Sequence, residues 1–107
     1  MEGGRRNNMK KLFISQPMRG KTDEEILSER DYAINRAEFM LGEKVEIIDT
    51  FFQDFNGKPL EALGKSISML ADADIAYFAP GWSAARGCRI EHECAVEYGI
   101  RTIESNA

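Results

Sequence analysis

The stretch DIAYFAPGWSAARGCRIEHECAVEYG, residues 74–99, contains the pattern that decides the fold. Residues 74–79 form a short apolar run, typical of a buried strand, which Pro80-Gly81 ends. From about Ala84 to Tyr98 the apolar residues recur with helical spacing, and Gly99 is a typical helix stop. A buried strand that leads through a short loop into a helix indicates a parallel α/β sheet.

The rest of the chain alternates in the same way. Further strands are predicted over 11–15, 44–49 and 100–103. One helix opens with a capping box at Thr22–Glu25, ends near Gly42, and is predicted to bury Ile26, Ala33, Ala37 and Met40. Another begins at Pro59, with an apolar stripe of Leu60, Leu63, Ile67 and Leu70. The order βαβαβαβ predicts a small, doubly wound, flavodoxin-like parallel sheet with strand order 2-1-3-4 and flanking helices.

Length and charge limit the function. At 107 residues the chain predicts one domain over 9–107, and the Gly-, Arg- and Asn-rich residues 1–8 are expected to be a disordered extension. A net charge of −4 argues against duplex nucleic acid and membrane surfaces as partners, and no apolar run is long enough to span a membrane. Cys88 and Cys94 fall on different helical faces, so free thiols and a cytoplasmic location are expected. With His92 they lack a fourth metal ligand, so we expect neither metal nor cofactor.

The predicted strand order reverses between the first and third strands, and ligands bind such sheets at that crevice. Two loops border it, 16–21 and 80–86. In the first, Gly20 allows close approach of a ligand, while Arg19 and Lys21 supply positive charge next to a helix N-terminus. These features suit a phosphate, although a surface turn with two solvated basic residues has the same pattern.

The second loop and its helix add an aromatic residue and a carboxylate. Trp82 either stacks on a base or sugar at the crevice or folds over the domain edge. Helical periodicity places Glu91 on the buried side with Gly87, Cys94, Ala95 and Tyr98, and places His92, Glu93 and Glu97 on a solvated side. Burying a carboxylate costs several kcal/mol unless it is paired, so Glu91 either has a functional purpose or is a structural partner of Arg19, Arg86 or Arg89.

The chain from Leu12 to Ile103 resembles the nucleoside 2-deoxyribosyltransferase superfamily, including its deoxynucleoside-monophosphate glycosidases and, most closely, a small bacterial and phage branch. The likeness rests on Glu91 with Gly87 four residues before it, Ala95 four after and Gly99 eight after, and on Met18-Arg19-Gly20, which matches the glycosidases' phosphate-holding Ile-Arg-Gly loop. It implies cleavage or transfer at an N-glycosidic bond, with Glu91 as the nucleophile that forms a covalent sugar–enzyme intermediate. It also implies a homodimer or higher homo-oligomer.

The resemblance also defines the expected site. Substrate and phosphate are expected to contact residues of both loops and of the neighbouring helices: Gln16, Met18, Arg19, Gly20, Ser66, Trp82, Ser83 and Gly87. Three positions depart from the family pattern. Ser66 stands where the family has an Asp, Ala85 where it has Asp or Ser (Ser83 replaces it if the loop shifts), and Glu93 where it usually has Gly.

Three functions therefore stay open. The chain is an N-glycosidase or deoxyribosyltransferase that acts on a nucleoside or nucleotide, a non-catalytic nucleotide sensor or sequestering protein, or an interaction domain in which Glu91 is a salt-bridged core residue. The missing acids at Ser66 and Ala85 predict slow chemistry, a different leaving group or lost catalysis. The sequence names neither the base nor the sugar.

Overall fold

The computed structural model describes residues 9–50 and 57–105. The sheet contains β1 (Lys10–Ser15), β2 (Val45–Ile48), β3 (Ile75–Phe78) and β4 (Arg101–Glu104). All pairings are parallel and the order is β2-β1-β3-β4, as predicted. Residues 1–8, expected to be a disordered extension, lie outside the described residues.

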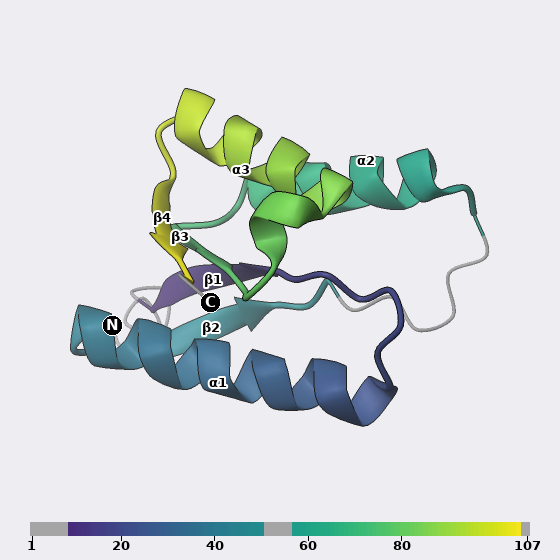
Figure 1. The fold of residues 1–107 in the computed structure, drawn as a ribbon. Coiled ribbons are helices and arrows are strands. Elements are labelled where there is room, and N and C mark those ends of the chain that lie inside the picture. Colours follow the sequence, from purple (N-terminus) through teal and green to yellow (C-terminus); the bar gives the residue numbers. More distant parts are fainter. Residues whose placement is uncertain (1–8, 51–56, 106–107) are drawn as a thin grey trace.

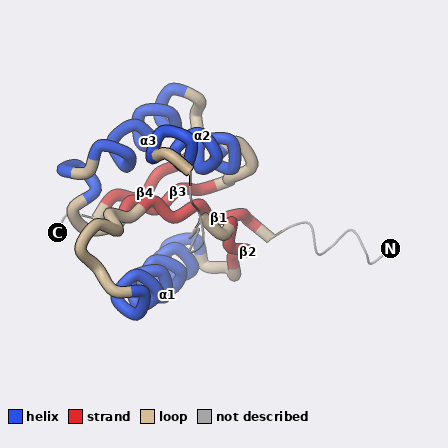
Figure 2. Tube along the Cα trace, turned by 90° about the vertical axis from the view of Figure 1, so that its right-hand side faces the viewer, coloured by secondary structure: helices blue, strands red, loops and turns tan. Residues whose placement is uncertain are grey.

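Three helices cover the two faces of the sheet. α1 (Asp23–Leu41) lies alone on one face, and α2 (Pro59–Leu70) and α3 (Arg86–Glu97) lie side by side on the other (Figures 1 and 2). Both signals predicted for α1 are present, a complete Thr22–Glu25 capping box and a left-handed Gly42 at the C-terminus. A short 3-10 helix, η2 (Trp82–Ala84), precedes α3, so α3 begins at Arg86 and not near Ala84. None of the described helices is long and apolar enough to cross a membrane.

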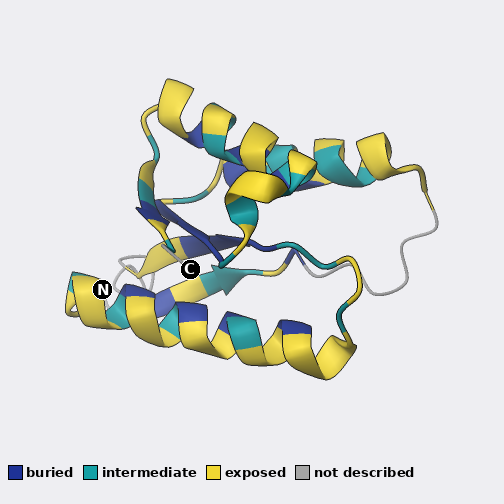
Figure 3. Cartoon of the chain, viewed as in Figure 1, coloured by how far each residue is buried: buried dark blue, intermediate teal, exposed yellow. Residues whose placement is uncertain are grey.

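The core consists of the strands and the inward sides of the helices (Figure 3). β3 is buried along its whole length, as expected of an inner parallel strand. On α1, Ile26, Ala33 and Ala37 are buried as predicted, but the fourth inward position belongs to Arg30, and Met40 is 45% exposed. Residues 26, 30, 33 and 37 keep helical spacing, and four residues after Ala37 the inward position belongs to Leu41, which packs against the core, so Met40 faces outward.

Three further burial predictions are wrong. Leu60 and Tyr98 are 75% and 84% exposed, because they lie at the free ends of the α2 and α3 faces. His92 was placed on a solvated side, yet it packs between Trp82 and Phe78, with ring centroids 4.3 and 4.8 Å away. The reason is that η2 folds back over α3 and places its tryptophan on the histidine ring.

Candidate functional site

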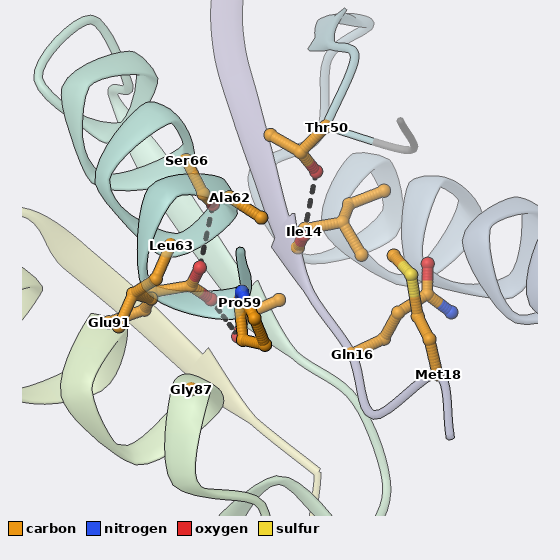
Figure 4. Close-up of a pocket in the computed structure, with 11 residues that line it drawn as sticks. Ile14, Gln16, Met18, Thr50, Pro59, Ala62, Leu63, Ser66, Gly87 and Glu91 are labelled. Carbon is orange, nitrogen blue, oxygen red and sulfur yellow. Dashed lines mark hydrogen bonds between the residues drawn. The ribbon is translucent and has the colours of Figure 1, made fainter. Parts of the chain in front are cut away.

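A cavity lies where β1 ends and the N-terminal halves of α2 and α3 converge. Its volume is about 230 Å³, and Figure 4 shows most of its lining. The walls combine apolar and polar side chains from four elements and their loops: Ile14, Ser15, Gln16, Met18, Thr50, Pro59, Ala62, Leu63, Ser66, Gly87 and Glu91. The cavity lies beyond the carboxyl end of β1, at the point where the strand order reverses, as predicted for the crevice, but of the two loops expected to border it only 16–21 contributes lining residues.

Glu91 is the acidic side chain of this cavity and projects inward from α3. It is 8% exposed, and each carboxylate oxygen accepts one hydroxyl hydrogen bond of 2.6 Å, from Ser15 Oγ and from Ser66 Oγ. Figure 4 shows the Ser66 hydroxyl pointing at the carboxylate from α2. Burial raises the pKa of Glu91 above its ordinary value, and the two hydroxyl hydrogen bonds partly oppose that rise.

Within the described residues, none of the three arginines considered as structural partners of Glu91 pairs with it. Arg19, Arg86 and Arg89 are exposed, and Arg89 donates instead to the carbonyl oxygen of Ser83 over 3.3 Å. Two neutral hydroxyls hold the carboxylate in place, so its charge is buried without a cation. A carboxylate held in this way keeps its position while its charge stays uncompensated, which suits attack on an electrophilic carbon.

The two serines differ in how far the sequence pointed to them. Ser66 was expected near the ligand because it occupies a family Asp position, and the structure places its hydroxyl on Glu91. Ser15 was missed, although its polar side chain at the end of the apolar run of β1 was a usable signal. Burial raises the pKa of the Cys88 thiol, and the nearby Ser15 hydroxyl partly opposes that rise, so this thiol is poorly suited to act as a nucleophile.

Gln16 lines the cavity, but its amide is held by α1. Nε2 donates to the Ile26 carbonyl at 3.3 Å and to Glu29 at 2.9 Å, while Oε1 accepts from Arg30 at 3.1 Å. Lys21, expected to offer charge to a phosphate, is 2.7 Å from Glu29 in an ion pair. This chain of contacts fixes the loop that joins β1 to α1.

Arg30 holds the other side of the same wall. Its Nη1 also donates to Thr50 Oγ1 at 3.4 Å, and the Thr50 hydroxyl donates to the Ile14 carbonyl at 3.2 Å. Within residues 9–50 and 57–105, Nη2 of Arg30 is buried without a hydrogen-bond partner. Burial lowers the pKa of this guanidinium, and the nearby Asp49 carboxylate opposes the change. Arg30 therefore supports the cavity wall through Gln16 and Thr50.

A second, adjoining cavity of about 490 Å³ contains the basic residues. The two loops form it, with Pro17, Met18, Arg19, Ala84, Ala85, Arg86 and Gly87 as lining. Met18 and Gly87 line both cavities, so Arg19 and Glu91 open onto neighbouring cavities rather than one. Gly20 has a φ of +80°, the turn that brings the loop back toward α1. No side chain caps the N-terminus of α3, so its first backbone N–H groups are available to a ligand. Arg19 and Arg86 line the same cavity.

The remaining predicted residues lie apart from Glu91. Trp82 lines neither cavity and stacks on His92 with an interplanar angle of 27°. The His92 ring also contacts Glu104 at 2.8 Å, so this cluster ties η2 and α3 to β4. Ser83 and Glu93 are exposed, and both cysteines are free. In the described parts of the chain no three histidine, cysteine or acidic side chains gather as a metal site.

Comparison with known proteins adds a family but no activity. Among curated proteins, none matches the chain. One family model, described as a domain of unknown function, DUF4406, matches residues 10–104, which includes the whole sheet and all the helices. The chain therefore belongs to the DUF4406 family of domains of unknown function.

Proposed function

We propose that this protein cleaves the N-glycosidic bond of a nucleoside or nucleoside monophosphate, as a cytoplasmic hydrolase or transferase, with Glu91 as the nucleophile. The observation that carries the proposal is the buried Glu91 carboxylate, which lines a cavity and is held by two serine hydroxyls with no cation beside it in the described residues. Ionising such a group costs free energy, and a buried charge that only stabilised the fold would be expected to have a cationic partner.

The proposed reaction has two displacements at one carbon. A Glu91 oxygen attacks the anomeric carbon of the sugar on the face opposite the base, and the C–N bond breaks with its electron pair going to the base. The leaving base takes a proton from water, because within the described lining of this cavity Glu91 is the sole carboxyl group. Water, or the nitrogen of a second base, then attacks the same carbon, breaks the sugar ester and restores the carboxylate.

The two serines are positioning residues in this scheme. Each donates to one oxygen of Glu91, so the carboxylate plane is fixed between α2 and β1. Hydrogen bonds to the charged form also oppose the effect of burial, so a larger fraction of Glu91 is ionised near neutral pH. Ser66 thus supports the nucleophile from a position where the resembled family has an acid. No acid at this position can therefore protonate the leaving base.

The neighbouring basic cavity supports a phosphate-bearing substrate. Arg19, Arg86 and the uncapped start of α3 offer a guanidinium pair and backbone donors, the chemistry that binds phosphate. Because Met18 and Gly87 line both cavities, a sugar above Glu91 would place a 5′-phosphate in reach of this region. Nucleoside 5′-monophosphates are therefore the preferred substrate class.

A non-catalytic nucleotide-binding protein is the second candidate. The observation that favours it is the absence, within the described lining of the Glu91 cavity, of any acid besides Glu91 that could protonate a leaving base. In that case Arg19 would still be needed for binding and Glu91 would not. The two functions differ in one readout, the release of free base.

The test is incubation of the purified protein with a panel of nucleosides and 5′-monophosphates, followed by chromatography for free base. We expect base release from at least one monophosphate, and we expect Glu91→Gln to lower it by at least about a thousandfold. Glu93→Gln is the matched control, since Glu93 is an exposed carboxylate of the same helix, and its activity should stay within about twofold of wild type. Binding without base release over long incubation would favour the second candidate.

A further inference from the structure

We infer that the Glu91 cavity selects nucleotides whose base has an exocyclic amino group, because the wall across from Glu91 offers hydrogen-bond acceptors. The inference rests on the proposed function for the orientation of the ligand, and it adds the class of base. Gln16 and Thr50 are the polar side chains of this wall, and Arg30 of α1 hydrogen-bonds both of them. Figure 4 shows Gln16 and Thr50 on the side of the cavity away from Glu91.

The amide of Gln16 has one possible orientation. Its Nε2 donates to the Ile26 carbonyl at 3.3 Å and to the Glu29 carboxylate at 2.9 Å, and both of these groups only accept. Its Oε1 accepts at 3.1 Å from Arg30, which only donates. Turning the amide over would place donor against donor at Arg30 and acceptor against acceptor at the other contacts. Both amide hydrogens of Gln16 are therefore used, and Oε1 keeps a lone pair for a ligand.

The hydroxyl of Thr50 is fixed in the same way. It donates its hydrogen to the Ile14 carbonyl at 3.2 Å and accepts from Nη1 of Arg30 at 3.4 Å. Because the carbonyl cannot donate and the guanidinium cannot accept, the hydroxyl has no hydrogen left for a ligand. Nη1 of Arg30 contacts both Thr50 Oγ1 and Gln16 Oε1, so these two acceptors lie close together.

The other polar side chains of the cavity have the same polarity. Ser15 and Ser66 direct their hydroxyl hydrogens at Glu91, whose ionised carboxylate only accepts. Arg30 is not part of the described lining, so its unpaired Nη2 supplies no donor there. The rest of that lining is apolar or glycine: Ile14, Met18, Pro59, Ala62, Leu63 and Gly87. Within the described lining, the side chains therefore present acceptors to a ligand.

The geometry of the proposed displacement places the base at this wall. Glu91 attacks the anomeric carbon from the face opposite the base, so the base lies on the side of Gln16 and Thr50. The amino group of adenine or cytosine has two hydrogens and can donate one to each oxygen. Hypoxanthine and uracil have a carbonyl oxygen at that position, which would face the lone pairs of the wall. Such a contact leaves buried polar groups unpaired and lowers affinity.

The test is calorimetric binding of two matched pairs of nucleotides. One pair is deoxyadenosine and deoxyinosine 5′-monophosphate, and the other is deoxycytidine and deoxyuridine 5′-monophosphate. In each pair an amino group is exchanged for a carbonyl oxygen, while sugar and phosphate stay the same. Both the wild type and Glu91→Gln are measured, since the variant keeps the wall and should not cleave its ligand. We expect the amino member of each pair to bind at least about tenfold more tightly.

Variants of the wall assign the preference to these residues. Thr50→Val removes one acceptor with little change in shape and should reduce the preference to about threefold or less, whereas the control Thr50→Ser keeps the hydroxyl and the preference. Arg30→Met is an independent variant. It leaves the Gln16 amide and the Thr50 hydroxyl able to turn a hydrogen to the ligand, so the preference should disappear. The wild-type comparison needs neither variant to fold.

The outcomes separate this inference from the proposed cleavage. Equal affinities within the pairs, tighter binding of the carbonyl members, or a preference unchanged in folded Thr50→Val and Arg30→Met would overturn the inference. Base release without any preference would overturn it and leave the proposed cleavage standing. Tighter binding of the amino members without base release would support it and contradict the cleavage. Binding of none of these nucleotides would overturn both.

Discussion

Replacing Glu91 by Gln should increase the stability of the folded protein near neutral pH. Burying a carboxylate costs several kcal/mol, and two hydroxyl hydrogen bonds return about 1.5–3 kcal/mol each. Burial is the larger effect, because the pKa of Glu91 is raised despite these bonds. Gln keeps the shape, accepts one serine hydrogen bond through its oxygen, and donates to the other serine oxygen. We therefore expect a gain of about 1–2 kcal/mol in the free energy of unfolding.

The sign of the pH dependence makes this prediction specific. A carboxyl whose folded pKa is raised binds its proton more tightly in the folded state, so wild-type stability falls as pH rises from the unfolded pKa through the folded one. Glu91→Gln has no such loss. In urea unfolding the advantage of the variant should therefore be larger at about pH 7.5 than at about pH 4.5.

The control is Glu93→Gln, which removes an exposed carboxylate of the same helix and should give a small difference at both pH values. A loss of about 3 kcal/mol or more in Glu91→Gln at neutral pH, without a pH trend, would refute the reasoning. That result is the one expected if Glu91 were a partner in a buried ion pair.

The other predictions concern the groups around Glu91. Ser66→Ala removes one hydrogen bond to the ionised carboxylate, worth about 1.5–3 kcal/mol, so the acid limb of the kcat/KM profile should move up by at least about one pH unit; an unchanged profile would show that Ser66 does not tune the nucleophile. Arg19→Ala should weaken binding of a 5′-monophosphate at least about tenfold in calorimetry and leave its nucleoside within about twofold, whereas equal losses would exclude a phosphate role. Trp82→Ala should cost about 2 kcal/mol of stability, measured by urea unfolding, without altering nucleotide affinity, since Trp82 stacks on His92 and lines neither cavity; a selective loss of affinity would contradict this placement.

Most of the fold could be predicted from local patterns. Alternating apolar runs and helical spacing gave all four strands, and the strand order followed from the handedness and short links of such units. The capping box at Thr22 and the left-handed Gly42 defined both ends of α1, because these signals act within a few residues. The start of α3 was less predictable, since η2 and α3 are both helical and differ only in their hydrogen-bond pattern.

Only those parts of the site that depend on strand order or on the periodicity of a single helix could be predicted. Glu91 was expected on the buried side near the crevice, and it lies there. Its partners could not be inferred, because Ser15 and Ser66 lie 76 and 25 residues away, and three exposed arginines were more obvious candidates. The position of Trp82 likewise depends on where η2 folds over α3, a contact that no local pattern encodes.

The measurement that tests the central claim most directly is intact-protein and peptide mass spectrometry of the protein after mixing with nucleoside 5′-monophosphates and quenching in acid. The proposed mechanism predicts a mass increase equal to one sugar phosphate minus one water, located on the peptide that contains Glu91 and formed together with one equivalent of free base. Glu91→Gln should form no such adduct, while Glu93→Gln should form it as wild type does. Base release without any adduct in the quenched samples, or an adduct on another residue, would contradict the role assigned to Glu91.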